Sequence, residues 1–276
     1  IREHTQIENI ISFGKKDNGT QSFHSLLAEK FLIERKLNVS PKDLSTIAYT
    51  SGTTGHPKGA MQSHEAVILN GSMMSQLHMR GSDDTVVSAL PCPHVYANVL
   101  MTGMMMFGTK LVLHKTFEVE AIFEAINIHQ ATIFDGVPTM YMFMLNSPNL
   151  KNSKLSSLKR CYVGGQTMPV ATMTAVEKEF KVPLIELWGM TEIAGLGATF
   201  PLFGPNKHGS IGCAIPYCEL KIADVNDCSN QMNAGEVGEL MVRGPITMMG
   251  YFGDEEKTRE TLELDGWLHS GDLAKI

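Results

Sequence analysis

The sequence lacks a run of basic residues, a C-x-x-C pair and any long apolar stretch. Its 276 residues carry 23 Lys and Arg against 29 Asp and Glu, a formal net charge of −6. An acidic chain without a cluster of Lys and Arg argues against a nucleic-acid partner. No apolar run approaches the about 20 residues of a membrane-spanning helix, and the first residues do not resemble a signal peptide. We therefore expect neither a transmembrane segment nor nucleic-acid binding.

The five cysteines are an odd number and lie far apart, without metal-ligand spacing. Such a set is typical of unpaired thiols in a reducing compartment and argues against a disulfide framework or a zinc site. We therefore expect a cytoplasmic location, with peripheral association with a membrane as the alternative. Hydrophobic residues make up 43% and charged residues 19% of the chain, which excludes a disordered or collagen-like protein.

Strand-like and helix-like segments alternate through most of the chain. Short runs rich in β-branched and aromatic residues predict strands at residues 47–50, 85–90, 110–114, 131–138, 160–165 and 184–189. Apolar periodicity, with Ser63 as an N-cap and Gly108 as a stop, predicts helices at 63–78, 96–107, 119–129, 140–145 and after Pro169. This alternation predicts an α/β fold whose mostly parallel sheet is covered by helices on both faces.

In such a sheet, ligands bind beyond the carboxyl ends of the strands. Glycine-rich loops follow three predicted strands, at Ser51, Gly164 and Gly189, and we expect them to converge on one edge. After about residue 205 the chain becomes glycine-rich, with short strands at 219–224 and 236–243 and an acidic helix at 254–262. The expected organisation is two α/β parts, residues 1–80 and 81–205, followed by a small antiparallel, barrel-like part, residues 206–276.

The segment YTSGTTGHPKG, residues 49–59, has the composition of a phosphate-binding loop. It does not match the Walker pattern, because Pro57 stands at the position of the second glycine and Lys58 is followed by Gly59. Its glycines still allow consecutive backbone N–H groups to face one anion, and its hydroxyls and lysine add donors and charge. A plain surface turn does not require this combination. The expected anion ligands are Thr50, Ser51, Gly52, Thr53, Thr54, Gly55 and Lys58.

This loop resembles the signature loop of the adenylate-forming superfamily, which includes acyl-CoA synthetases, beetle luciferases and the adenylation domains of peptide synthetases. Further segments resemble the family's other motifs in the family's order: LPCPHVYAN (90–98), GGQTMP (164–169), ELWGMTE (186–192), GELMVRGPITMMGYF (238–252) and DGWLHSGDLA (265–274). In the last motif Ser270 replaces the commoner threonine and keeps the hydroxyl. The resemblance covers the chain from about residue 44, points to the acyl-CoA synthetase branch and implies a layered αβαβα fold.

The resemblance implies an ATP-dependent reaction in two steps. A carboxylate attacks the α-phosphorus of ATP, which releases pyrophosphate and leaves an acyl-adenylate, and the thiol of coenzyme A then displaces AMP. The implied ligands are ATP, Mg²⁺, coenzyme A and a small carboxylic acid, and a homodimer is a further hypothesis. By the resemblance the phosphate loop holds the β- and γ-phosphates, Thr191 donates to the α-phosphate and Glu192 binds Mg²⁺. The alternative for Glu192 is a solvated surface acid.

The resemblance also implies an adenosine site. Asp272 would accept hydrogen bonds from both ribose hydroxyls, and the ring of Trp188 would stack on the adenine. From the residues alone, Trp188 also fits the end of a buried strand and Asp272 a turn. The residues expected around the adenine are Gly164, Gly165, Gln166, Trp188, Gly189 and Met190.

The segment at 90–98 bears on which acid is activated. The resemblance places His94 in the acyl pocket near the reacting carboxylate as a catalytic residue, although a lone histidine is more often structural. Amino-acid-activating relatives commonly have an aspartate here, and its absence disfavours an amino acid. Met-rich segments at 99–106 and 140–144 suit an adaptable acyl tunnel, and their helical spacing also fits ordinary core. We expect a hydrophobic, fatty acid; the alternatives are an aryl acid, a luciferase-like oxidation, and a non-catalytic nucleotide-binding fragment or degenerate relative.

Relatives in this superfamily have a longer segment ahead of the phosphate loop, and they continue past the last motif into a mobile lid domain. That lid carries a lysine that assists adenylation, and its rotation builds the coenzyme A site. We therefore expect the 276 residues to be a fragment of the large domain. Such a fragment would bind ATP or acyl-AMP weakly and would not complete thioester formation.

Overall fold

The computed structural model describes residues 7, 9–13, 19–29, 37–50 and 57–276, in two compact units, 1–39 and 40–276. In the first unit, strand β1 (Ile11–Ser12) pairs in parallel with β2 (Gln21–Ser22), and helix α1 (Phe23–Ala28) follows directly. The hydroxyl of Ser22 caps this helix by accepting from the Ser25 N–H. All of the site residues discussed below belong to the second unit.

The second unit is built on a seven-stranded sheet in the order β11-β10-β9-β8-β7-β5-β6. Its strands run parallel from β6 to β9, and β10 and β11 are antiparallel. The central strands β7 and β8 are buried along their whole length, as expected for a parallel sheet covered on both faces. The predicted α/β fold is confirmed. The bounds are β5 (Thr85–Ser88), β6 (Lys110–Leu113), β7 (Ile133–Gly136), β8 (Arg160–Gly164), β9 (Leu184–Met190), β10 (Gly195–Thr199) and β11 (Cys213–Ala214).

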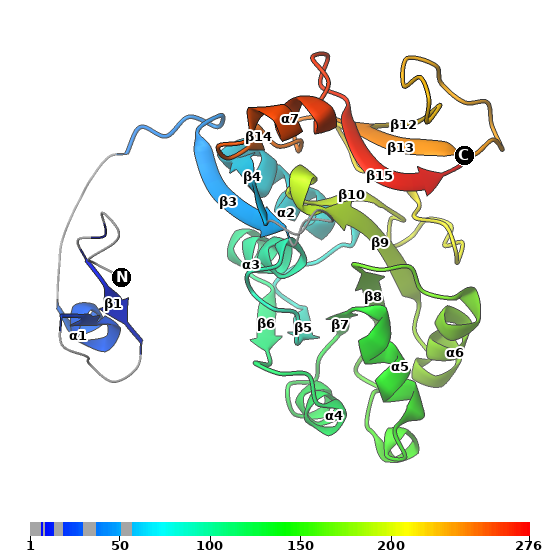
Figure 1. Cartoon of the computed structure of the whole chain (residues 1–276). Coiled ribbons are helices and arrows are strands. Elements are labelled where there is room, and N and C mark those ends of the chain that lie inside the picture. The colour runs from blue at the N-terminus through cyan, green and yellow to red at the C-terminus, as the bar shows by residue number, and fades with distance from the viewer. Residues whose placement is uncertain (1–6, 8, 14–18, 30–36, 51–56) are drawn as a thin grey trace. The chain divides into compact units, whose positions relative to one another are not determined.

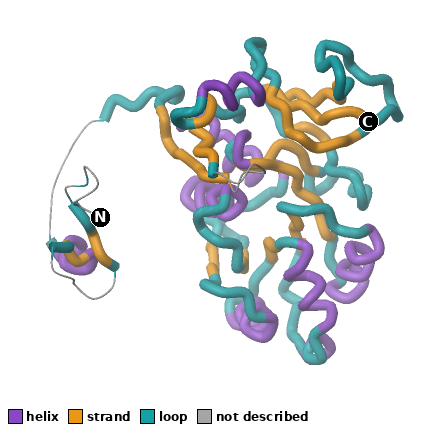
Figure 2. Tube along the Cα trace, viewed as in Figure 1, coloured by secondary structure: helices purple, strands orange, loops and turns teal. Residues whose placement is uncertain are grey.

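Helices cover this sheet, so that the strands lie between layers of helices (Figures 1 and 2). The step from β5 to β6 runs in the opposite direction to the steps from β6 to β7, β8 and β9. Because such crossovers are right-handed, α3 lies on one face of the sheet and α4, α5 and α6 lie on the other. Helix α2 packs beside α3. The bounds are α2 (His64–Leu77), α3 (Val95–Phe107), α4 (Val119–Ile128), α5 (Pro138–Asn146) and α6 (Val170–Phe180).

Capping residues set the ends of α2 and α3 as the sequence indicates. The Ser63 hydroxyl accepts from the Ala66 N–H at 3.1 Å and begins α2. Gly108, with a φ of 72°, ends α3 in the left-handed conformation that glycine adopts without strain. Both helix boundaries were predicted from these residues.

Strand β3 (Leu44–Thr50) corrects one expectation. It pairs antiparallel with β4 (Lys58–Ser63), and β14 (Gly250–Tyr251) joins β4 to make a separate three-stranded sheet. The strand before Ser51 therefore does not share the parallel sheet with β8 and β9, and the expectation that all three glycine-rich loops follow strands of one parallel sheet is wrong for this strand. Residues 51–56 themselves lie outside the described part of the chain. Only residues 51–57 connect β3 to β4, which suits a hairpin, whereas a parallel crossover needs about a dozen residues.

The C-terminal part forms an antiparallel sheet of β12 (Glu219–Ala223), β13 (Gly238–Arg243) and β15 (Leu268–Ala274). Helix α7 (Glu255–Thr261) begins at Asp254, whose side chain accepts from the Lys257 N–H. Two short 3₁₀ turns complete the elements, Leu150–Asn152 and Thr191–Ile193. The antiparallel character and the helix were predicted, and strand β15 was not.

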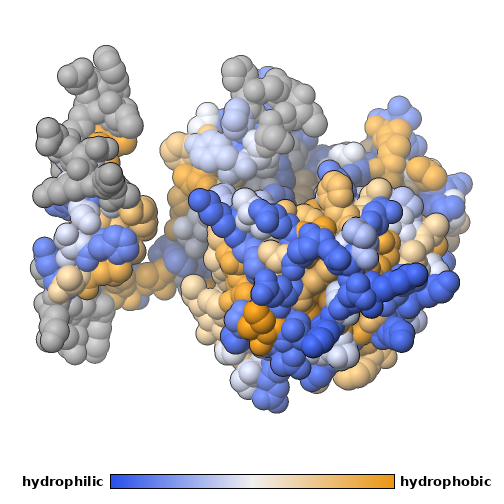
Figure 3. Space-filling view, turned by 90° about the horizontal axis from the view of Figure 1, so that it is seen from below, coloured by the Kyte–Doolittle hydropathy of each residue, from blue (hydrophilic) through white to orange (hydrophobic). Residues whose placement is uncertain are grey.

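The surface seen from below mixes hydrophilic side chains with apolar ones (Figure 3). Exposed apolar residues on this unit include Met142 and Phe143 of α5. In the part of the chain that the structure describes, every helix is too short or too polar to span a bilayer.

A buried charge pair lies beneath α2 and α3. The Arg80 guanidinium donates to both oxygens of Asp135, at 2.8 and 3.0 Å, and lies over the Tyr162 ring at 4.3 Å. Tyr96 donates its hydroxyl hydrogen bond to the same carboxylate at 2.9 Å. Asp135 is fully buried, and these donors replace the water that its charge would otherwise require.

We expect Arg80→Met to lower the free energy of unfolding by about 3–5 kcal/mol, because Asp135 would remain buried without its counter-charge. Denaturant titration measures this change. Glu219→Gln is the control, since it breaks the 2.9 Å pair with Arg243 at the surface and should leave the unfolding midpoint nearly unchanged. Small and equal effects of the two substitutions would contradict the importance of the buried pair.

Candidate functional site

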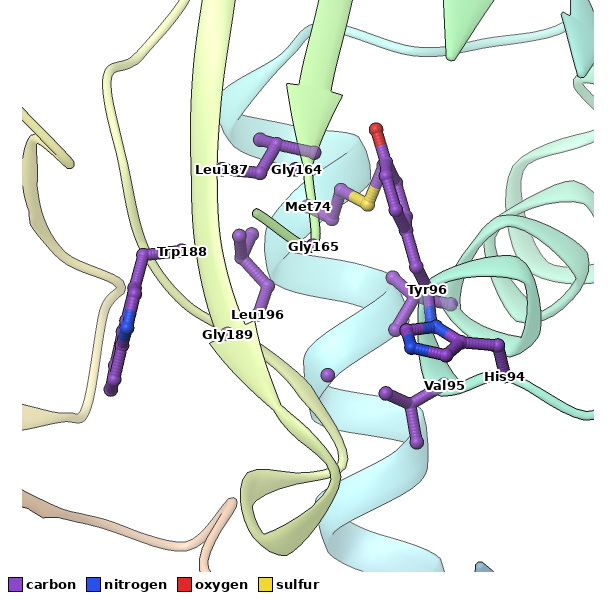
Figure 4. Close-up of a pocket in the computed structure, with 12 residues that line it drawn as sticks. Met74, His94, Val95, Tyr96, Gly164, Gly165, Leu187, Trp188, Gly189 and Leu196 are labelled. Atoms are coloured by element: carbon purple, nitrogen blue, oxygen red, sulfur yellow. The ribbon is translucent and has the colours of Figure 1, made fainter. Parts of the chain in front are cut away.

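A cavity of about 40 Å³ lies at the carboxyl ends of β8 and β9, against α2, α3 and β10. Ligands of open α/β sheets bind beyond the carboxyl ends of the strands. The cavity wall is mainly apolar (Figure 4). Its lining residues are Met74, His94, Val95, Tyr96, Val99, Gly164, Gly165, Leu187, Trp188, Gly189, Gly195 and Leu196. His94, Gly164, Gly165, Trp188 and Gly189, predicted from separate motifs, thus lie together.

Glycines make room where the strands end. A Cβ on Gly189 would lie 1.8 Å from the carbonyl oxygen of Gly195 on the neighbouring strand β10. A Cβ on Gly164 would lie 3.0 Å from the Leu187 carbonyl oxygen, and Gly165 has a φ of 85°. At Gly189 the backbones approach so closely that only glycine fits.

His94 begins α3 and lines the cavity. Its Nδ1 accepts from the Tyr96 N–H at 3.2 Å, so the neutral ring carries its proton on Nε2. His94 is exposed overall, and the partial desolvation of its ring lowers the pKa of His94 below its ordinary 6.5. At neutral pH the side chain therefore offers an uncharged N–H donor. Beside it, burial and Asp135 raise the pKa of Tyr96 well above its usual value, so this hydroxyl stays protonated.

Trp188 points away from the cavity, with the strand ribbon between its ring and the side chains of His94 and Tyr96 (Figure 4). Its ring lies over Gly197, where a Cβ would come within 2.5 Å of Cζ3. Its Nε1–H donates to Asp272 Oδ2 at 2.9 Å. The two residues predicted to bind adenine and ribose are thus in contact, although 84 positions separate them. The arrangement has two sides: the cavity on one side of β9, and the Trp188–Asp272 pair on the other.

Glu192 lies in the 3₁₀ turn that directly follows β9. It is 8% exposed, and its Oε1 accepts from the Tyr251 hydroxyl at 2.7 Å. Lys58 Nζ lies 5.2 Å from the centre of the same tyrosine ring. Tyr251 therefore links a predicted phosphate ligand to the predicted metal ligand, and burial followed by the Glu192 contact raises the pKa of its hydroxyl.

The donor chemistry of Glu192 suits a magnesium ion. Tyr251 bonds only Oε1, and among the described residues no other side chain bonds this carboxylate. The second oxygen is a hard, anionic ligand of the kind that Mg²⁺ accepts together with water and phosphate oxygens. Glu192 is buried rather than solvated, which argues against its reading as a surface acid.

Two buried amides hold the turn between β9 and β10. Asn70 of α2 donates to the Ile193 and Leu196 carbonyl oxygens, at 3.1 and 2.8 Å, and accepts from the Leu196 N–H at 2.9 Å. Gln62 of β4 donates to the Thr191 carbonyl oxygen at 2.8 Å. These contacts join the turn after β9 to α2 and to the hairpin of β3 and β4.

The remaining predicted residues differ in what the structure says of them. Ser51, Gly52, Thr53, Thr54 and Gly55 lie outside the described residues. Thr50 is the last residue of β3, and Gln166 is exposed in the turn after β8. Met190 and Thr191 are half-buried where β9 passes into its 3₁₀ turn.

Sequence reasoning did not assign four residues that the structure places here: Tyr96, Tyr251, Asn70 and Gln62. Tyr96 and Tyr251 lie inside quoted motifs, so their position was a usable signal. Asn70 carried a weaker one, because it follows the apolar run of residues 66–69, and Gln62 carried none in its polar surroundings.

Comparison with known proteins gives one consistent result. The family model described as "AMP-binding enzyme" matches residues 2–252. An indoleacetate–CoA ligase of Aromatoleum aromaticum is 33% identical over 267 residues, 96% of this chain and 52% of that protein. A long-chain-fatty-acid–CoA ligase of Bacillus subtilis is 33% identical over 84% of this chain and 41% of that protein. The chain thus spans about half the length of the curated relatives it matches.

Solved structures agree with this result. ATP-bound MatB from Rhodopseudomonas palustris superimposes with a TM-score of 0.85 at 28% identity, over 94% of this chain and 51% of that one. A long-chain-fatty-acid-CoA ligase (FadD1) from Archaeoglobus fulgidus superimposes with a TM-score of 0.86 at 25% identity, over 97% of this chain and 55% of that one.

The approach of β9 to β10 can be tested with one methyl group. Gly189→Ala should lower the free energy of unfolding by about 2 kcal/mol or more, because the new Cβ would overlap the Gly195 carbonyl. Gly81→Ala is the matched control, since a Cβ there meets nothing within 4 Å. Thermal unfolding compares the two, and equal midpoints would contradict the close approach.

Proposed function

Because this chain belongs to the AMP-binding enzyme family, we propose that it carries the ATP and acyl sites of an AMP-forming carboxylate–CoA ligase. The observation that carries the proposal is the two-sided arrangement at the end of β9. His94 and the cavity lie on one side, Trp188 and Asp272 lie on the other, and Glu192 lies in the turn that directly follows the strand. A carboxylic acid and a nucleotide bound on the two sides would meet at this strand end.

On the nucleotide side, the ring of Trp188 would stack on adenine, a contact of about 1–3 kcal/mol by analogy with base–aromatic stacking. Asp272 uses Oδ2 for the Trp188 N–H, which leaves Oδ1 for a ribose hydroxyl. Thr191 and Lys58 would donate to phosphate oxygens. Glu192 would hold Mg²⁺, which supplies charge neutralisation at the phosphates.

The proposed chemistry follows from these positions. An oxygen of the acid attacks the α-phosphorus, and the bond to the bridging oxygen breaks so that pyrophosphate leaves. The thiol of coenzyme A then attacks the acyl carbonyl carbon, loses its proton, and AMP leaves. Positioning and electrostatics dominate such phosphoryl chemistry. The neutral Nε2–H of His94 would orient an oxygen of the acid without neutralising the attacking carboxylate.

We assign a hydrophobic acid, with a fatty acid as the first choice over an aryl acid. The described cavity wall has no acidic side chain, and the Tyr96 hydroxyl is already bonded to Asp135. A second cavity of about 10 Å³ lies beyond Met74 and Val99, which line both cavities. Since methionine adapts its shape readily, Met74 is the side chain that a longer acyl group would displace.

Acid-dependent exchange between ATP and pyrophosphate tests the activity, in this chain and in the protein encoded by the complete reading frame. Glu192→Gln should lower the exchange rate about 100-fold or more, because a charged ligand at the phosphates is lost. Glu179→Gln, an exposed residue of α6, is the matched control. Unchanged exchange in Glu192→Gln would contradict the assignment. ATP binding without exchange in the complete protein would identify a nucleotide-binding protein instead.

Substrate preference tests the acyl side. Met74→Ala should join the two cavities and shift kcat/KM toward longer acids, by about 4-fold for each added methylene that becomes buried. Met173→Ala is the control, because it also removes a buried methionine but lies on the opposite face of the sheet. An unchanged profile in Met74→Ala would place the end of the acyl site elsewhere.

A further inference from the structure

Residues 270–272 of β15 are held by a side-chain cluster that the proposed reaction does not use. The Glu239 carboxylate of β13 contacts Gly271 of this segment with one oxygen and the preceding His269 with the other. Oε2 lies 2.8 Å from His269 Nδ1, and Oε1 accepts from the Gly271 N–H at 3.0 Å. Glu239 therefore ties the imidazole of His269 to the backbone immediately before Asp272.

This segment is an irregularity in the pairing of β13 and β15. Met241 pairs with His269 and Glu239 with Leu273, so the register shifts between them. Gly271 has a φ of 73°. Bulges of this kind redirect a side chain, and here Asp272 reaches the Trp188 Nε1–H at 2.9 Å. The position of Asp272 thus depends on what holds the bulge.

Both ring nitrogens of His269 face carboxylates, because Nε2 lies 2.9 Å from Glu263 Oε1. A neutral imidazole has one N–H, so only the imidazolium donates to Glu239 and Glu263 together. Burial opposes this charge, but the two carboxylates outweigh it and raise the pKa of His269 above its ordinary 6.5.

The charged groups around His269 belong to three parts of the chain: β13, the segment after α7, and β12. Glu239 belongs to β13, and Glu263 follows α7 with Asp265 nearby. From the β12 side, Cys228 Sγ lies 3.5 Å from Glu263, and Lys221 Nζ lies 3.3 Å from the Cys228 carbonyl oxygen. The cation on His269 is therefore the group that contacts both Glu239 and Glu263.

We propose that doubly protonated His269 and Glu239 are positioning residues that hold Asp272 and Trp188 in the geometry that binds adenosine. The proposal rests on the proposed function, which places the nucleotide on this side of β9. The imidazolium contacts are complete at low pH and are lost as the pH rises through the raised pKa of His269. Adenosine affinity should therefore fall as the pH rises through the raised pKa of His269.

The test uses Trp188 as its reporter. The chain has two tryptophans, so Trp267→Phe leaves Trp188 alone. Adenosine is the probe because it has no phosphate to titrate, and its affinity is measured by fluorescence between about pH 6 and pH 9. His269→Gln should weaken binding about 3- to 10-fold at the acid end and remove the pH dependence, because the charged hydrogen bonds to Glu239 and Glu263 are lost. His208→Gln, which breaks a histidine–carboxylate pair with Glu177, is the matched control. It should change neither the affinity for adenosine nor the pH dependence of that affinity.

Glu263→Gln separates positioning from folding. It leaves the Glu239–Gly271 contact in place and removes one carboxylate from His269. Affinity at low pH should be retained, and the alkaline loss should move to lower pH because the imidazolium is less stabilised. A merely structural role would not move this midpoint.

The outcomes are distinguishable. If Trp267→Phe does not bind adenosine, or Asp272→Asn binds it equally well, the proposed nucleotide site fails. If binding is present and depends on Asp272, but His269→Gln and Glu263→Gln leave the pH profile unchanged, the positioning proposal alone is overturned.

Ligand atoms of Cys228, Glu263 and His269 lie within 4.8 Å of one another. Loss of binding with a chelator and recovery with Zn²⁺ would replace the imidazolium by a metal and also overturn the proposal.

Discussion

The turn that joins β9 to β10 is the constraint on which the site depends. Asn70 satisfies three backbone groups of this turn, and Gln62 satisfies a fourth. Because these groups are buried, leaving them without partners would cost about 1–3 kcal/mol each. The same contacts place Glu192 at the strand end and keep Gly189 against Gly195. Two amide side chains thus connect the parallel sheet, the hairpin at Lys58 and the proposed metal ligand.

Strand β9 gives the site its two chemically different sides. Toward α3 the wall is apolar, and the buried charge pair of Arg80 with Asp135 is neutralised internally and holds the Tyr96 hydroxyl. On the other side, Trp188 and Asp272 offer an aromatic face and a carboxylate. Under the proposed function, the apolar side would take the acid and the side with Trp188 and Asp272 would take the nucleotide.

Much of this could be predicted from the sequence, and the failures have identifiable causes. The helix start at Ser63, the helix end at Gly108 and the parallel sheet follow from local residue types and periodicity. Strand β3 was placed in the wrong sheet because its partner is decided by the short connection to β4, which pairs on its other edge with the distant β14. Strand β15 was missed because its glycine and charged residues have low strand propensity, and its pairing with β13 overrides that preference.

The sequence by itself determined the chemical groups available, their order along the chain, the helix boundaries and the glycines at the strand ends, because these depend on neighbouring residues. Tertiary structure alone decided which groups meet. Trp188 contacts Asp272 across 84 positions and Glu192 contacts Tyr251 across 59, and neither pairing follows from local spacing. It also decided that Trp188 lies on the opposite side of β9 from His94. Such contacts form only when the sheet, its helices and the C-terminal strands pack together, since packing supplies the free energy that closes long stretches of chain.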